Sequence, residues 1–312
     1  MTGPFPTVVQ TKFSAPVIEA DLSPDGTLVA VALRDRSRSP GAVKVLRAND
    51  LSVVSEWGGA SLARGVCFTH GGAELRYLAE SESNELAIDL HRVDLGTGED
   101  TVVTPYSRRH DNPTRVIVSP DHALLAVLGR MAEVWDLESG TVVRRVSMHE
   151  AANPNQRMRA AFAPQGPTLY AHGVREDVVR VDLREPDSVS GGWASPTTGP
   201  GPVVVSPDGA KLAACGERGC GVFLYDLESG ERLGEDEWDE DATYSWEVAF
   251  TQDSESFVYA LGSPSLVALS DFDEEDGPEV FETIVRVLRK APAADVFLFA
   301  TEYGHLVVAT KA

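Results

Sequence analysis

The feature that most constrains the fold of this chain is a turn that recurs about every 45 residues along its whole length. Each copy joins an alternating apolar stretch to a second stretch of small apolar residues. Clear copies of the form Ser-Pro-Asp-Gly, or close to it, begin at Ser23, Ser119 and Ser206, and degenerate copies contain Thr69, Ala163, Thr251 and Ala291. A repeat of this length, with only strand patterns between its copies, predicts a β-propeller.

One repeat shows how each blade is expected to be built. Residues 114–118 alternate between apolar and polar, and the turn that begins at Ser119 contains a proline that presets φ. Residues 124–128 form a continuous apolar run, as expected of a strand that is buried on both faces. Two further strand-like stretches, 131–137 and 141–146, complete the repeat. This pattern predicts a four-stranded antiparallel meander.

The third stretch of several repeats ends in a related phrase. Trp135-Asp136 ends it in one repeat, and the letters Asp-Leu-Glu-Ser-Gly occur at both 136–140 and 226–230. In these phrases and in its Ser-Pro-Asp-Gly turns, the chain resembles the WD40 family and its bacterial relatives. The resemblance covers nearly the whole chain and implies a propeller architecture. The chain has only one Trp-Asp pair and no Gly-His dipeptide before a first strand, so we expect apolar packing to stabilise the blades.

The length of 312 residues is sufficient for seven such repeats in one domain. We therefore expect an all-β fold, a single seven-bladed propeller with four antiparallel strands in each blade. The last repeat supplies only three strands, 285–289, 296–301 and 305–310, so we expect residues 7–13 to complete blade seven and close the ring, which removes exposed edges. The predicted blades cover residues 16–57, 63–106, 114–148, 158–194, 201–238, 245–283 and 284–312.

Charge and cysteine content narrow the expected partners and compartment. The formal net charge of -21 argues against nucleic acid or a membrane as the partner, because phosphate binding needs clustered positive charge. The sequence has neither a secretory signal pattern nor a long apolar run, so we expect a cytoplasmic protein. Scarce lysine and abundant alanine and valine are typical of a GC-rich bacterial genome. The thiols of Cys67, Cys215 and Cys220 are expected to be reduced and not to bind metal.

The loops between blades contain residues that predict a protein-docking surface. In a propeller, the loops that enter each blade share one face with the loops that join second and third strands. Arginine and aromatic side chains supply most binding hot spots, and complementary charge sets the register of a complex. The candidates are the basic residues Arg34, Arg36, Arg38, Arg108, Arg109, Arg157 and Arg159 and the acidic and aromatic residues Trp238, Asp239, Asp241, Tyr244 and Trp246. The alternative is that these loops are simply solvated.

A second acidic run has a spacing similar to that of a calcium loop. The first, third, fifth and twelfth positions are Asp271, Asp273, Glu275 and Glu282, but the glycine comes one place late and no flanking helix is expected. We therefore favour a solvated hairpin turn over a metal site and expect no cofactor.

No sequence motif predicts an active site. The seven histidines are scattered among the repeats, and no nucleophile elbow, phosphate loop or metalloprotease motif is present. The favoured function is a non-catalytic protein-protein interaction scaffold, or a regulatory or sensory subunit of a bacterial complex, whose partner has a basic surface. Two alternatives remain open. One is a propeller hydrolase of the lactonase type with a site at the central channel mouth, and the other is an acidic immunity-type protein that blocks a basic partner.

Overall fold

The computed structural model describes most of the chain outside a set of short segments. The described residues are 7–34, 43–57, 62–108, 111–147, 159–172, 177–185, 189–194, 200–216, 221–236, 247–260, 264–268, 274–276, 285–291, 295–301 and 303–311. Within these ranges the fold is all-β, with one 3₁₀ turn, η1 (His70–Gly72), and no α-helix. Accordingly, the described residues include no helix that is long and apolar enough to cross a membrane.

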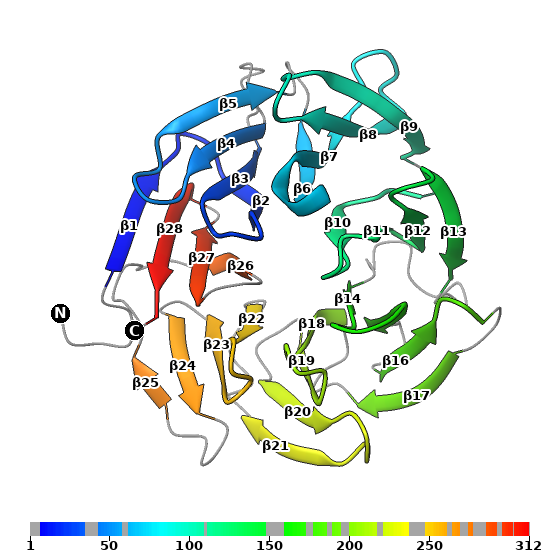
Figure 1. Cartoon of the computed structure of the whole chain (residues 1–312), viewed down its shortest axis with the longest axis vertical. Helices are drawn as coiled ribbons and strands as arrows, with labels where there is room; N and C mark the ends of the chain where they lie inside the picture. Colours follow the sequence, from blue (N-terminus) through cyan, green and yellow to red (C-terminus); the bar gives the residue numbers. More distant parts are fainter. Residues whose placement is uncertain are drawn as a thin grey trace. The chain divides into compact units, whose positions relative to one another are not determined.

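The strands form seven four-stranded sheets of the β-propeller type, and every pairing that the structure describes is antiparallel (Figure 1). Six sheets are continuous, because each is made of four strands that follow one another in the chain. The first three continuous sheets are β2 (Val17–Leu22), β3 (Leu28–Leu33), β4 (Val43–Arg47) and β5 (Val53–Trp57); β6 (Ala63–Thr69), β7 (Glu74–Glu80), β8 (Ala87–Asp94) and β9 (Asp100–Ser107); and β10 (Arg115–Val118), β11 (Leu124–Leu128), β12 (Ala132–Asp136) and β13 (Thr141–Val146).

The next three continuous sheets follow the same order. They are β14 (Arg159–Phe162), β15 (Thr168–His172), β16 (Asp177–Asp182) and β17 (Val189–Ala194); β18 (Pro200–Val205), β19 (Lys211–Gly216), β20 (Val222–Asp226) and β21 (Arg232–Asp236); and β22 (Glu247–Phe250), β23 (Ser256–Ala260), β24 (Pro264–Ala268) and β25 (Glu274–Asp276).

The remaining sheet takes strands from both ends of the chain. It consists of β26 (Val285–Lys290), β27 (Val296–Thr301), β28 (His305–Thr310) and, at its edge, β1 (Thr7–Lys12). The register of β1 against β28 runs from Thr7 opposite Thr310 to Lys12 opposite His305. A backbone hydrogen bond of 2.9 Å, donated by Phe13 N to Gly304 O, continues the pairing beyond the strand. The N-terminal strand therefore pairs with the last strand of the chain, as predicted from the sequence for residues 7–13.

The prediction of one disc made of seven repeats needs correction. Six sheets, not seven, are continuous repeats, and the contacts within the chain group its residues into two compact units. Unit 1 comprises Met1–Val118, Gly262–Pro264 and Glu275–Ala312, and unit 2 comprises Ser119–Leu261 and Ser265–Glu274. The physical reason lies in the packing, since each apolar cluster that the structure describes joins neighbouring sheets within one unit.

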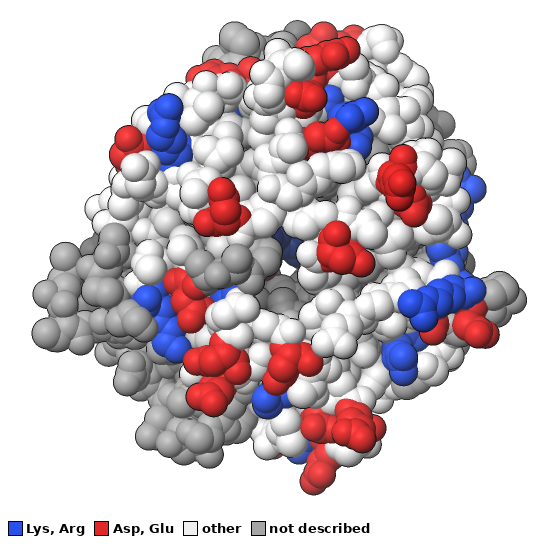
Figure 2. Space-filling view, viewed as in Figure 1, with Lys and Arg blue, Asp and Glu red and all other residues white. Residues whose placement is uncertain are grey.

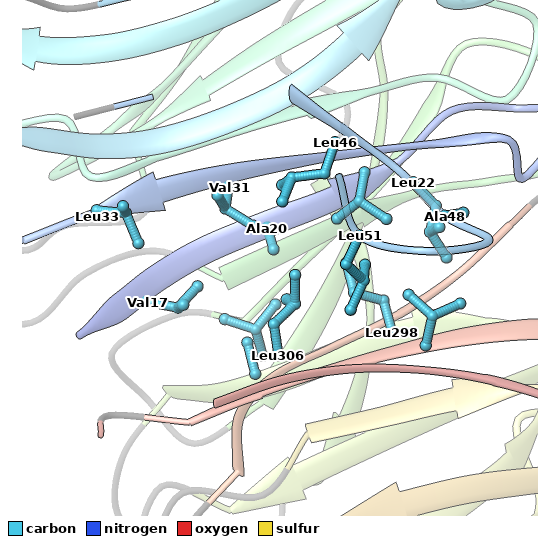
Figure 3. Packing of buried hydrophobic residues seen from close by; sticks show 14 of the residues in the cluster. Val17, Ala20, Leu22, Val31, Leu33, Leu46, Ala48, Leu51, Leu298 and Leu306 are labelled. Carbon is cyan, nitrogen blue, oxygen red and sulfur yellow. The ribbon is translucent and has the colours of Figure 1, made fainter. Parts of the chain in front are cut away.

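The largest such cluster in unit 1 joins the first continuous sheet to the sheet that contains both chain ends. Figure 3 shows Val31 and Leu46 facing Leu298 and Leu306, and all four are almost fully buried. The strands that contribute them are short runs of valine, leucine and alanine, which fill a pleated surface buried on both faces. Burial of this apolar surface is the main stabilising term for the contact between the two sheets.

The recurring turn has one hydrogen-bond pattern in both units. In its first copy, Ser23 Oγ donates to Asp25 Oδ1 at 2.6 Å and accepts a bond from Leu28 N at 2.9 Å. The same two bonds recur at the turns that begin with Ser119, Ser206 and Thr251. The serine or threonine hydroxyl thus connects the turn to the start of the second strand, which explains why the repeat needs this residue type.

The fourth turn position is left-handed whether or not it is glycine. Its φ is 71° at Gly26 and 76° at Gly209, but also 56° at His122 and 62° at Ser254. Glycine adopts this conformation without a steric cost, whereas a side chain is strained in it. Two copies of the turn therefore carry local strain that the surrounding sheet compensates.

Candidate functional site

The first strands of neighbouring sheets lie side by side in unit 1. Strand β6 packs against both β2 and β10, and β2 also packs against β26 (Figure 1). The approach of β6 to β10 depends on Gly65, because a Cβ atom at this position would lie 3.1 Å from Arg115 Cα. Polar residues on β2, β10 and β26 are thereby brought into one place, and we refer to Glu19, Asp21, Arg115 and Arg289 as the inner cluster.

Glu19 is the centre of the inner cluster. Its side chain is 7% exposed, and its Oε2 atom lies 2.9 Å from Nε of Arg115. Its Oε1 atom contacts Nη2 of Arg289, so one buried carboxylate is shared by guanidinium groups from two other strands. Such an arrangement satisfies a charge that would be costly to bury alone, and it ties β2 to β10 and β26.

Asp21 lies on the same face of β2 as Glu19, two residues further along. Its Oδ2 atom accepts a 2.8 Å hydrogen bond from Phe68 N on β6, and the described part of the chain provides it with no ion pair. Burial raises the pKa of Asp21 to about 7, and the Glu19 charge contributes to the rise, although the Phe68 amide and Arg115 oppose it. A carboxyl group with a pKa near neutrality can both hold and release a proton, as general acid-base chemistry requires.

The cysteine next to this cluster does not add a nucleophile. Burial raises the pKa of the Cys67 thiol well above its ordinary value, and the nearby Asp21 charge acts in the same direction. A thiol that stays protonated is a poor nucleophile. Cys67 and Cys215 are both buried and unbridged, as the sequence predicted for them, whereas Cys220 lies outside the described residues.

A second polar cluster in unit 1 lies within a single sheet. The Asp100 carboxylate accepts a 2.5 Å hydrogen bond from the Tyr77 hydroxyl and lies 2.9 Å from His91 Nδ1, while the Tyr77 and His91 rings stack 4.3 Å apart. Burial works to raise the pKa of Asp100, but the hydrogen bonds from His91 and Tyr77 outweigh it and keep this pKa below its ordinary value. The three groups connect β7, β8 and β9, so we interpret them as a link that holds this sheet together.

The predicted docking residues are divided between described and undescribed parts of the chain. Arg34 follows β3 and is exposed, and Arg159 begins β14 in unit 2. Arg108 follows β9, where its Nη2 atom lies 3.0 Å from Glu80 Oε1, an atom that also binds Arg64. The charge of Arg108 is therefore partly neutralised within unit 1. The other candidates lie outside the described residues: Arg36, Arg38, Arg109, Arg157, Trp238, Asp239, Asp241, Tyr244 and Trp246.

The weak calcium candidate is also mostly outside the described residues. Asp271, Asp273 and Glu282 fall in undescribed segments, and Glu275 lies in the short strand β25. Within the described ranges, no group of three or more His, Cys, Asp or Glu residues could hold a metal ion.

The inner cluster is not among the sites predicted from the sequence, although a signal for it is present there. Its members stand two or four residues before the first residue of a recurring turn, on one face of the first strand. The position two residues before each turn carried this signal, because it is ionisable in three of the four copies in unit 1 and apolar in the copies of unit 2. That position holds Asp21, Cys67, Ile117 and Arg289 in unit 1, and Ala161, Val204 and Ala249 in unit 2.

Comparison with known proteins adds no family assignment to this geometry. The sequence matches no family model, and no curated protein matches it.

Proposed function

We propose that this chain is a non-catalytic protein-binding module that binds an extended, basic segment of a partner along its outer strands. By outer strands we mean the last strands of the six continuous sheets, which lie at their open edge: β5, β9, β13, β17, β21 and β25. The WD40-like interpretation of the repeat and the placement of the protein in a bacterial complex belong to the same proposal.

The observation that carries the proposal is where the exposed apolar side chains lie. Seven of the nine large apolar side chains that are exposed in the described part of the chain belong to outer strands, so the exposure is systematic and not scattered. The seven are Val53, Val54, Val102, Val103, Val143, Val189 and Leu233. An outer strand also has backbone groups along its open side, to which an added strand can form hydrogen bonds.

The edge formed by β5 and β9 in unit 1 is the best-defined part of this surface. Four valines on these two strands are between 40% and 54% exposed. The two strands are connected, because Trp57 Nε1 donates a 3.4 Å hydrogen bond to Gly98 O in the turn before β9. Each strand also has a bulge against its neighbour, which twists the edge and disfavours indiscriminate pairing.

The charge around this edge favours a basic partner. Glu99 lies just before β9, and Glu56 lies on β5, where it pairs with Lys44, so acidic side chains stand near the exposed valines. Acidic groups are also dispersed over the face drawn in Figure 2, as the net charge of -21 implies. Lysine or arginine next to apolar residues in an added strand would complement both features.

The test is a binding measurement with defined peptides. A short peptide of alternating lysine and valine should bind the protein in a salt-dependent manner, whereas its glutamate-valine counterpart should not. The double variant Val54→Lys, Val102→Lys should weaken binding at least about tenfold. The matched control is Leu86→Lys in the same unit, which replaces an exposed apolar residue outside the outer strands and should leave binding unchanged. Equal binding of the two peptides, or an equal effect of control and double variant, would contradict the proposal.

A further inference from the structure

The Asp21 carboxylate lies at the contact between two sheets of unit 1. Its Oδ2 atom bonds to the backbone of Phe68, 47 residues further along the chain, so this side chain connects β2 directly to β6. The phenylalanine itself is 1% exposed and belongs to the apolar cluster shared by the two sheets. A change of charge at Asp21 therefore acts on a packed interface and not on a solvated loop.

The charged groups around Asp21 leave it without a dedicated counterion. Glu19, on the same strand, is the residue that Arg115 of β10 and Arg289 of β26 contact. Strand β6 faces Asp21 with the Phe68 amide and the Cys67 thiol. The other elements packed against β2 are β3 and β27, and neither contains a titratable residue. Ionised Asp21 would therefore be a second negative charge beside Glu19, stabilised by the Phe68 and Leu22 amides and by the more distant charge of Arg115 but, among the described residues, by no ion pair of its own.

We propose that the proton on Asp21 controls how tightly β2 packs against β6, so that this contact opens more readily as the proton is lost near neutral pH. Loss of the proton to solvent places the half-buried Asp21 carboxylate beside the buried Glu19 carboxylate at the contact between the sheets. The amide bond from Phe68 compensates only part of that cost.

The direction of the pH effect follows from the pKa of Asp21, which burial raises from 3.8 to about 7 in the folded chain. Between these two values the folded state binds a proton that the open state releases, so the contribution to stability is fully present below 3.8. It decreases as pH rises and is lost once pH passes through about 7. The equilibrium constant for opening should accordingly rise about tenfold from about pH 6 to about pH 8.

Two buried thiols make this opening measurable. Cys67 lies on β6 next to Asp21, and Cys215 lies on β19 in unit 2, so each thiol reacts with a neutral labelling reagent only when its own region opens. We would replace Cys220 with serine and measure the labelling rates of Cys67 and Cys215 in one sample by mass spectrometry. Their ratio removes the pH dependence of thiol ionisation, because both thiols share it in the open state.

The expected result is a ratio of Cys67 to Cys215 labelling that rises about tenfold from about pH 6 to about pH 8. In Asp21→Asn, whose side-chain oxygen can still accept the Phe68 amide, the ratio should stay constant. Asp25→Asn, an exposed turn substitution four residues away in the same unit, should behave as the parent does. A constant ratio in the parent would overturn the proposal even if Asp21→Asn failed to fold, and so would an equal rise in Asp21→Asn.

Discussion

In both units the first strand of a sheet ends in the same recurring turn. The units differ in the type of side chain that stands two residues before this turn. In unit 1 this position holds the ionisable residues Asp21, Cys67 and Arg289 and one apolar residue, Ile117. In unit 2 it holds Ala161, Val204 and Ala249. Val204 packs against an apolar cluster between its sheet and the next one, so no charge has to be compensated at that position.

The repeat therefore specifies a four-stranded sheet but not which side chains lie between the first strands of neighbouring sheets. The turn at Ser23 in unit 1 and the turn at Ser206 in unit 2 form the same hydrogen bonds. The turn therefore fixes the strands, and the residues before it decide whether the contact is apolar or ionic. An apolar contact is indifferent to pH, whereas we expect the contact between β2 and β6 in unit 1 to depend on it through Asp21.

The largest expected loss of stability comes from a glycine at the contact with β1 in unit 1, and the matched control is a glycine in a turn of unit 2. Gly304 has φ 85°, and a Cβ atom there would lie 2.5 Å from Phe13 O and 2.7 Å from Ala15 O. Gly140 also has a positive φ, 65°, but nothing lies within 4 Å of its added Cβ. We expect Gly304→Ala to lower the free energy of unfolding by more than about 3 kcal/mol and Gly140→Ala by about 1 kcal/mol. Urea unfolding of both variants measures this difference, and equal losses would show that β1 contributes little to unit 1.

The next largest expected loss of stability comes from neutralising a buried glutamate in unit 1, and the control is a more exposed glutamate in the same unit. Glu19→Gln leaves two arginines without their shared carboxylate and should cost about 3 kcal/mol. Glu56→Gln removes the partner of Lys44 in an exposed pair and should cost less than about 1 kcal/mol. Unfolding in urea near neutral pH checks both variants. Similar costs would mean that the inner cluster behaves as a surface ion pair.

A smaller effect tests whether the turn really is equivalent in the two units. Ser23→Ala and Ser206→Ala each remove one bond to the turn aspartate and one from the following strand. Because both serines are buried, we expect each substitution to cost about 1 to 2 kcal/mol. Calorimetric melting of the two variants should give equal shifts. Unequal shifts would indicate that the turn, and not only the inner position, differs between units.

The smallest expected effect is a gain in stability. His122 in unit 2 occupies with φ 56° the turn position that Gly26 occupies in unit 1 with φ 71°. His122→Gly should relieve strain and stabilise the protein by about 0.5 to 1 kcal/mol. The same calorimetric measurement detects the change as a rise in the melting temperature, and a fall would mean that the imidazole contributes more than its backbone costs.

Local features of this fold could be predicted from the sequence, because each depends on residues close together in the chain. The stretches 124–128 and 141–146, defined by their apolar runs, coincide with β11 and β13. The turn that begins at Ser119 was also predicted, and it forms with hydrogen bonds from and to the serine hydroxyl. Long-range features could not be predicted, because they depend on which strands become neighbours. The division into two units and the meeting of Glu19 with Arg115 and Arg289 are of this second kind.

The site was less predictable than the fold for the same reason. The docking candidates were predicted from charged loops, which are easily recognised in a sequence. Most of these candidates, such as Trp238 and Arg157, lie outside the described residues. Asp21 stands inside an ordinary alternating strand and becomes unusual only through burial between β2 and β6. Similarly, Val54 and Val102 look like core residues until the sheet order shows that their strands lie at open edges.

The most direct test of the difference between the units is a carboxyl titration followed by carbon NMR. Our account predicts one aspartate carboxyl resonance that titrates at about 7 and is missing from the spectrum of Asp21→Asn. The turn aspartates, among them Asp25, should titrate below their ordinary range, since hydrogen bonds from Ser23 and the Thr27 amide lower the pKa of Asp25. A spectrum in which the resonance lost in Asp21→Asn titrates with those of the turn aspartates would contradict the account.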